Sequence, residues 1–274
     1  MAKIDRLGWA AGTCFASYGV RFGVRVNQPE VLKRLPQHLP PGWKPSPSSQ
    51  VDRLYSLLVG RPQARVRRYN LLYSGVARRA RTMDLDELFE TFESDLRFQV
   101  AAAARRKIFV HAGVVAWRGR AIVLPGRSFS GKTTLVAELL RAGATYYSDE
   151  FAVLDERGRV HPFPKLLSVR EEGGAIRKCS PEAMGSFTGA KPLPVAVIAL
   201  SHYRARARWR PSRLSAGQGL LALLASTVPV RRRPEASLGV LQRVVSQAII
   251  LKGKRGEAAE VAPALLNLLE QETR

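Results

Sequence analysis

Residues 121–134 read Ala121-Ile122-Val123-Leu124-Pro125-Gly126-Arg127-Ser128-Phe129-Ser130-Gly131-Lys132-Thr133-Thr134, and the expected fold follows from them. An apolar strand runs directly into the pattern G-x-x-x-x-G-K-[ST], and residues 135–141 favour a helix. This order of strand, loop and helix is typical of a phosphate-binding loop, or P-loop. The alternative, a glycine-rich turn that happens to precede a helix, explains neither the Lys-Thr pair nor the apolar strand before it.

The P-loop pattern assigns chemistry to this segment. The residues expected to bind nucleotide phosphates are Gly126, Arg127, Ser128, Phe129, Ser130, Gly131, Lys132, Thr133 and Thr134. The glycines let backbone amides wrap around an anion, and the helix N-terminus adds positive potential. Lys132 would place a charge on the outer phosphates, and Thr133 would offer its hydroxyl to Mg²⁺. ATP and Mg²⁺ are therefore the expected cofactors.

A pair of acids follows the P-loop helix. We expect that helix to end at Gly143, a left-handed cap, and residues 144–147 to form a strand that delivers Ser148-Asp149-Glu150 to its end. Strand ends in a parallel sheet face the ligand crevice, where an acid can orient Mg²⁺ or accept the proton of an attacking hydroxyl. Spacing alone leaves open the alternative of a solvated acidic turn.

The segments before the P-loop predict a long helix and a hairpin. The helix starts near Met83 with Thr82 or Asp84 as its cap, and its apolar positions are Leu85, Leu88, Phe89, Phe92 and Leu96. Residues 108–117 and 121–125 read as two strands joined by a turn at Arg118-Gly119.

The first eighty residues predict a small α+β unit. Alternating apolar residues at 20–26 indicate a half-buried strand, residues 30–39 and 51–59 favour helices, and residues 66–73 favour a strand. The proline-rich segment 40–47 reads as a loop. We therefore expect an α/β fold: a P-loop kinase-like sheet with covering helices in residues 81–274, opened by a connector helix and preceded by an α+β unit in residues 1–80.

Positive charge is the extreme feature of the composition. Lys and Arg number 44 against 22 Asp and Glu, for a formal net charge of +22. Residues 201–255 hold twelve of the basic side chains and a single acid, Glu235. In residues 204–210 every second residue is Arg, which as a strand would make an anion-binding ridge and as a loop would be merely solvated. An anionic partner is expected.

Several protein classes are excluded by composition. The chain lacks an apolar run of the ~18 residues that a membrane span needs, and its N-terminus lacks a signal-peptide pattern, so we expect a cytoplasmic protein without membrane contact. Two cysteines, Cys14 and Cys179, make neither a disulfide framework nor a thiolate metal site. The histidines show no metal-ligand spacing, and no Ser, His and Asp arrangement suggests a hydrolase.

The order His111-Ala112-Gly113-Val114, P-loop, Gly143 and Ser148-Asp149-Glu150 resembles the HPr kinase/phosphorylase family, in which two acids stand at the same distance beyond the P-loop lysine. The resemblance covers roughly residues 108–172. It implies that His111, Lys132, Asp149 and Glu150 are catalytic, that Thr133 and Asp149 contact the metal, and that Asp149 is the base toward a serine hydroxyl. A purely structural role for His111 stays open.

One departure from the family concerns the downstream Glu-Ile-Arg-Gly signature, whose counterpart here is Ser168-Val169-Arg170-Glu171. Arg170 matches the arginine of the signature, whereas Ser168 stands where the family has its glutamate. In the family this signature accompanies the phosphorylase reaction, so a one-way kinase is favoured, with Glu171 or Glu172 as a replacement metal contact. The chain is more similar to stand-alone relatives that resemble peptide-tailoring kinases.

The expected function is transfer of the ATP γ-phosphate to a hydroxyl of a peptide, an acidic protein or a small molecule. A second hypothesis is a nucleotide-dependent nucleic-acid-binding protein that uses the basic second half, although the chain has no nucleic-acid-binding motif and no Walker B strand. A third is a module that binds nucleotide without transfer. Association into a homo-oligomer is left open.

Overall fold

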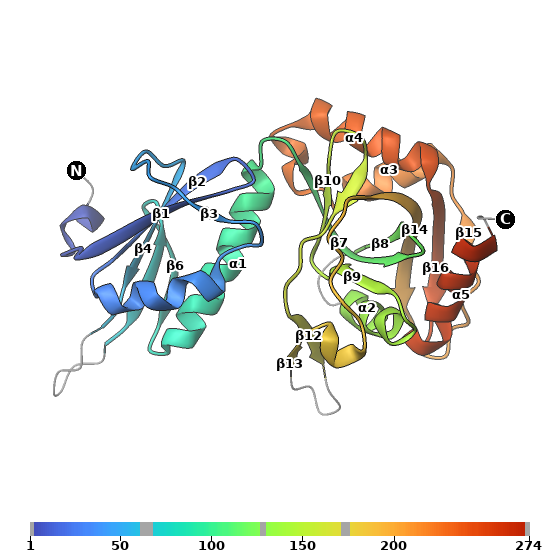
Figure 1. The fold of residues 1–274 in the computed structure, drawn as a ribbon, viewed down its shortest axis with the longest axis horizontal. Helices are drawn as coiled ribbons and strands as arrows, with labels where there is room; N and C mark the ends of the chain where they lie inside the picture. The colour runs from blue at the N-terminus through green and yellow to red at the C-terminus, as the bar shows by residue number, and fades with distance from the viewer. Residues whose placement is uncertain (1–2, 61–67, 127–129, 171–175, 272–274) are drawn as a thin grey trace. The chain divides into compact units, whose positions relative to one another are not determined.

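The computed structural model describes residues 3–60, 68–126, 130–170 and 176–271. Its contacts divide the chain into two units, Met1–Arg106 (unit 1) and Lys107–Arg274 (unit 2). Both units combine strands and helices, which confirms the mixed α/β class (Figure 1). Among the described helices, none combines the length and the apolar character that crossing a membrane requires.

Unit 1 is built on one sheet. Its elements are η1 (Lys3–Arg6), β1 (Ala11–Ser17), β2 (Val20–Val26), η2 (Pro29–His38), β3 (Lys44–Pro45), β4 (Arg53–Leu58), β5 (Asn70–Ser74), β6 (Ala77–Thr82) and α1 (Leu85–Ala103). The six strands follow the order β3-β1-β2-β4-β5-β6. Of the described strand pairs in this sheet, β2–β4 is parallel and the others are antiparallel.

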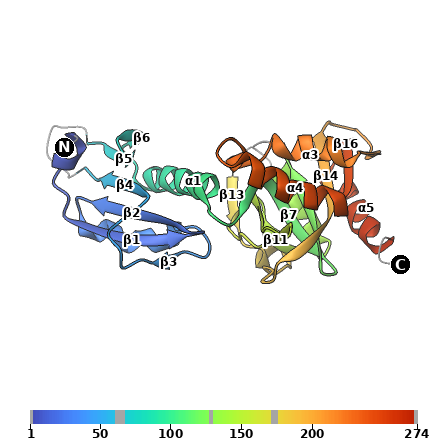
Figure 2. The same ribbon diagram turned by 90° about the horizontal axis from the view of Figure 1, so that it is seen from above.

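Helix α1 packs its apolar side chains against the sheet of unit 1. Figure 2 shows the helix beside the strands. The Asp84 carboxylate caps it by accepting a hydrogen bond from the Asp86 amide at 2.7 Å, as the sequence predicted. Phe92 is fully buried and packs edge-on against Tyr55 of β4, with ring centroids 5.1 Å apart. This packing ties α1 to unit 1, so the division by contacts differs from the boundary expected between residues 80 and 81.

One expectation for unit 1 needs correction. The helix expected over residues 51–59 is wrong, because residues 53–58 form β4 between β2 and β5. A short apolar run fits a helix face or a strand equally, and here pairing on both sides satisfies the backbone as a strand. The helix expected over residues 30–39 is present as the 3₁₀-helix η2, with Pro36 inside it.

Unit 2 holds the P-loop segment. Its elements are β7 (Ile108–Trp117), β8 (Arg120–Pro125), α2 (Lys132–Arg141), β9 (Thr145–Ser148), β10 (Phe151–Leu154), β11 (Arg159–His161), β12 (Leu167–Arg170), β13 (Ile176–Cys179), η3 (Glu182–Met184), β14 (Leu193–Tyr203), β15 (Ser212–Arg213), α3 (Ala216–Leu224), η4 (Val228–Arg231), α4 (Pro234–Gln247), β16 (Ile249–Arg255) and α5 (Ala258–Gln271). The main sheet has eight strands in the order β11-β10-β7-β8-β14-β16-β15, with β9 paired to β7. Within it β8, β14 and β16 are parallel, whereas β7 is antiparallel to β8.

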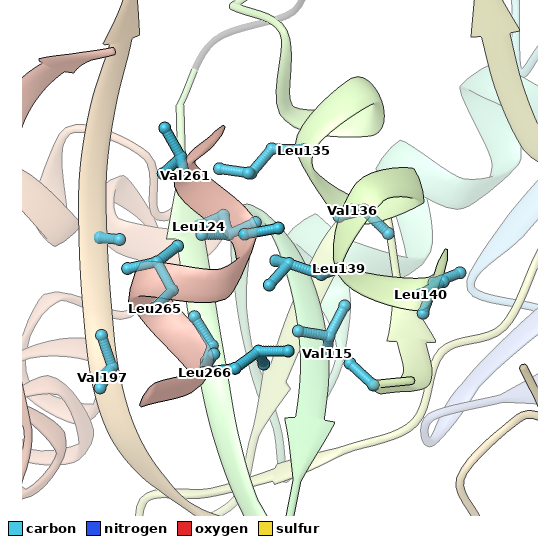
Figure 3. Packing of buried hydrophobic residues seen from close by; sticks show 14 of the residues in the cluster. Val115, Leu124, Leu135, Val136, Leu139, Leu140, Val197, Val261, Leu265 and Leu266 are labelled. Carbon is cyan, nitrogen blue, oxygen red and sulfur yellow. The ribbon is translucent and has the colours of Figure 1, made fainter. Parts of the chain in front are cut away.

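Helices cover both faces of the main sheet. One buried cluster joins the sheet to α2 and α5, and the other joins it to α3 and α4. Figure 1 shows α3 and α4 on one side of the strands and α2 on the other. Figure 3 shows the first cluster from close by, with Leu139 of α2 and Leu265 of α5 pointing toward Leu124 and Val197 of the sheet. These clusters hold the P-loop helix against the strand that precedes it.

The predicted turn signals of unit 2 are confirmed by backbone angles. Arg118 and Gly119 have φ of 49° and 76°, both left-handed, as a tight two-residue hairpin between β7 and β8 requires. Gly143 has φ of 94° directly after the end of α2, where a left-handed residue ends the helix.

We predict that Leu139→Ala lowers the free energy of unfolding of unit 2 by about 2–5 kcal/mol, because the side chain is fully buried and its removal leaves a cavity. The control is Leu221→Ala, where the side chain is 69% exposed and the expected change is below ~0.5 kcal/mol. Urea denaturation measures both. Equal losses would show that α2 does not pack as described.

Candidate functional site

The P-loop leaves the sheet where β8 ends. The Gly126 amide donates to the His111 carbonyl of β7 at 3.4 Å, and the Lys132 ammonium donates to the Gly126 carbonyl at 2.7 Å. Helix α2 begins at Lys132, after Gly131 with φ of 81°. Thr133 and Thr134 lie in its first turn. Of the predicted phosphate ligands, Arg127, Ser128 and Phe129 lie outside the described residues.

The acids lie beside the P-loop and directly after the end of β9, as expected, although β9 is antiparallel to its neighbour β7. Strands β9 and β10 both run along β7, antiparallel to it, and Asp149 and Glu150 form the break between them. The Glu150 carbonyl still accepts the Ala112 amide of β7 at 3.0 Å. The two acids are thus held in the middle of a long strand pair, because the chain continues into β10 rather than turning away from the sheet.

Asp149 connects the acids to the P-loop helix. The Thr133 hydroxyl donates toward Asp149 Oδ2 at 3.4 Å, and the Tyr146 hydroxyl donates toward Oδ1 at 3.3 Å. Its side chain is only 2% exposed. Asp149 Oδ2 therefore faces α2, while Oδ1 accepts from the Tyr146 hydroxyl.

Lys165 is a site residue that the sequence did not reveal. Its ammonium lies 3.4 Å from Asp149 Oδ1 and 3.7 Å from Glu150 Oε2, so a single cation serves both acids. It comes from the irregular segment between β11 and β12, which carries no motif. In the sequence, Lys165 is a single lysine that follows Pro164 among apolar residues, and this pattern does not by itself indicate a site.

These groups surround one cavity of about 340 Å³. The residues that line it are His111, Gly131, Lys132, Thr133, Thr134, Asp149, Glu150, Lys165, Ser168 and Ile176. The structure thus gathers the predicted histidine, lysine, threonines and acids at one place. Ser168 of β12 also lines the cavity, whereas Glu171 and Glu172 lie outside the described residues. A cavity of about 420 Å³ in unit 1 contains no comparable cluster of charged side chains among the residues that line it.

Burial sets the protonation of the cavity groups. It lowers the pKa of His111 to about 4, with help from the charges of Lys132 and Lys165, so the imidazole is neutral at pH 7. Burial also lowers the pKa of Lys132 to about 8, against the opposing pull of the two acids. The pKa of Asp149 is raised by burial, although Lys165 counteracts the shift. The cavity therefore holds a lysine that loses its proton more easily, and an aspartate that takes one up more easily, than the same side chains in water.

Of the two alternatives for residues 204–210, the structure shows a loop and not the strand that would have made an arginine ridge. Strand β14 ends at Tyr203, and the chain turns at Ala205 and Arg206, where φ is 61°. The Ala207 amide donates to the Arg204 carbonyl at 3.0 Å, so this backbone closes a turn instead of joining a ladder. Four adjacent like charges favour this solvated arrangement over one aligned strand face.

No protein-family model and no curated protein matches the chain.

The lowered pKa of Lys132 predicts a pH-dependent affinity for anions. Since its folded-state pKa of about 8 lies below the ordinary 10.5, the ammonium loses its proton as pH rises through that value. The Kd for MgATP should then rise by up to about tenfold per pH unit above pH 8. Lys132→Ala should bind weakly at every pH, with a flat profile and an unchanged circular dichroism spectrum. Calorimetric titration between pH 7 and 9.5 measures this, and a flat wild-type profile would contradict it.

Proposed function

We propose that this protein is a P-loop kinase that transfers the γ-phosphate of ATP to a hydroxyl group, with serine of a peptide or protein as the preferred acceptor. The observation that carries the proposal is the 3.4 Å approach of the Thr133 hydroxyl to Asp149 Oδ2 beside the P-loop lysine. A phosphate-binding loop and a buried carboxylate thus share one cavity, as phosphoryl transfer to a hydroxyl requires. The parallel strands β8, β14 and β16 are compatible with a P-loop kinase fold.

The cavity residues suit magnesium bound together with ATP. Among the described residues, no group of three His, Cys, Asp or Glu side chains could hold a metal by itself. Mg²⁺ in kinases typically uses one or two protein oxygens together with substrate phosphates, and Thr133 and Asp149 supply such oxygens. When bound there, the metal would neutralise charge on the transferred phosphoryl group.

The protein groups account for the remaining steps of transfer. Lys132 and the N-terminus of α2 hold the negative phosphate chain, and Asp149 accepts the acceptor's hydroxyl proton as the oxygen attacks the γ-phosphorus. The bond to the β-phosphate oxygen breaks, and ADP leaves. Burial that raises the pKa of Asp149 makes it a stronger base than an exposed aspartate. The neutral His111 imidazole can hydrogen-bond to a phosphate oxygen without repelling Lys132.

A second candidate rests on the exposed arginines of residues 204–210, which are suited to a nucleic-acid backbone. The experiment incubates the protein with γ-labelled ATP in the presence of serine-containing peptides, DNA or RNA. Label on a peptide supports the kinase. Release of free phosphate only with nucleic acid supports the second candidate, and ATP binding without either product indicates a nucleotide-binding module.

We predict that Asp149→Asn still binds MgATP but transfers phosphate about a hundredfold more slowly or worse, because the amide cannot accept the proton. Glu150→Gln is the matched control and should cost less, since its side chain is 19% exposed against 2% for Asp149. Initial rates of peptide labelling at saturating ATP measure both. Near-normal transfer by Asp149→Asn together with collapse in Glu150→Gln would reassign the base to Glu150.

A further inference from the structure

Arg255, the last residue of β16, is a buried cation beside the P-loop. The whole residue is 2% exposed. Its Nη2 donates to the Gly131 carbonyl at 2.8 Å, and Nη1 donates to the Gly256 carbonyl at 3.0 Å. The guanidinium thus spans from the C-terminal end of a parallel strand to the residue on which α2 starts.

The contact with Gly131 is close enough to restrict that position. A Cβ atom at Gly131 would lie 2.4 Å from Arg255 Nη2, and φ of 81° disfavours any side chain there. The Gly131 carbonyl and the Lys132 amide belong to one planar trans peptide and point in opposite directions. The Leu135 amide also donates to this carbonyl, at 3.1 Å. The guanidinium and the helix together therefore aim the Lys132 N–H away from Arg255 and toward the side where a phosphate would bind.

Arg255 forms no ion pair with an acid among the described residues, and its Nε has no hydrogen-bond partner. The negative charge of Glu257 attracts the guanidinium without forming an ion pair with it. The nearby Glu257 carboxylate instead accepts the Tyr203 hydroxyl at 3.1 Å, and the Tyr203 ring lies 5.5 Å from the guanidinium. Burial lowers the pKa of Arg255. A cation beside the first turn of a helix also opposes the helix dipole, so helix stability does not explain its presence.

We propose that Arg255 is a positioning residue for the phosphate chain of a nucleoside triphosphate: it fixes the Gly131–Lys132 peptide in its anion-binding orientation and supplies a buried charge that the bound phosphates neutralise. The inference rests on the proposed function and adds to it a residue from β16, a strand that β14 separates from β8. Its effect is directed at phosphate and not at the nucleoside, because its one hydrogen bond to the P-loop is to the backbone carbonyl of Gly131.

The test compares Arg255→Gln with Lys254→Gln, which removes the same charge from the adjacent, exposed residue on the opposite face of β16. Calorimetry measures the Kd of sodium tripolyphosphate, MgATP and adenosine at pH 7.5. Arg255→Gln should weaken the two phosphate ligands by about tenfold to a hundredfold, the range for hydrogen bonds from charged groups, and leave adenosine within about twofold. Lys254→Gln should change the phosphate ligands by less than about threefold.

Equal losses in the two variants, or an equal loss for adenosine, would overturn the inference, because a general structural defect weakens every ligand. If Arg255→Gln does not fold, Arg255→Lys decides: its single ammonium cannot hold both carbonyls in the same geometry, so tripolyphosphate should still bind about tenfold more weakly. Unchanged binding by Arg255→Lys overturns the inference. The Lys132→Ala variant separates the inference from the proposed function. If Lys132→Ala also binds tripolyphosphate as well as the wild type, the proposed function fails together with the inference. If Lys132→Ala is impaired and Arg255→Gln is not, the inference alone fails.

Discussion

The antiparallel pairing of β7 with strands on both of its edges is the constraint on which the candidate site depends. On one edge β8 pairs with residues 112–117 and releases the chain into the P-loop. On the other edge β10 and β9 pair in succession and leave the two acids at the break between them. The His111 carbonyl holds Gly126, and the Ala112 amide holds Glu150. Neighbouring residues of one strand thus set the separation between the phosphate site and the carboxylates.

Much of this frame could be predicted from local sequence. The Asp84 cap, the Arg118-Gly119 turn and the Gly143 helix stop are encoded within a few residues, and their chemistry admits few alternatives. Strand β4 could not be predicted this way, because a short apolar run fits either a helix or a strand until its partners β2 and β5 are known. The alternating arginines of residues 204–210 left strand and loop open for a related reason. Periodicity shows which residues share a face only when the segment is a strand.

Two site residues, Arg255 and Lys165, could not be predicted from the sequence for a different reason. Arg255 contacts Gly131 across 124 residues of sequence, and Lys165 reaches Asp149 from an irregular segment. Neither stands in a motif, since a single Lys or Arg is common on any surface. Their importance is visible only through burial and through the groups they meet. Sequence therefore specifies the P-loop backbone, whereas the charges that complete the site come from tertiary structure.

The acidic side chains around the cavity can be compared in number with the basic ones. Asp149 and Glu150 share the ammonium of Lys165, and Lys132 adds a second positive charge, so two acids face two lysines. Arg255 forms no ion pair among the described residues, although the charge of Glu257 attracts it. A buried charge without an ion pair costs several kcal/mol on the scale of ion desolvation, so a further compensating group is favoured. Since the guanidinium lies against the carbonyl of Gly131 in the P-loop, the polyphosphate that we propose as ligand would add negative charge where the geometry favours it.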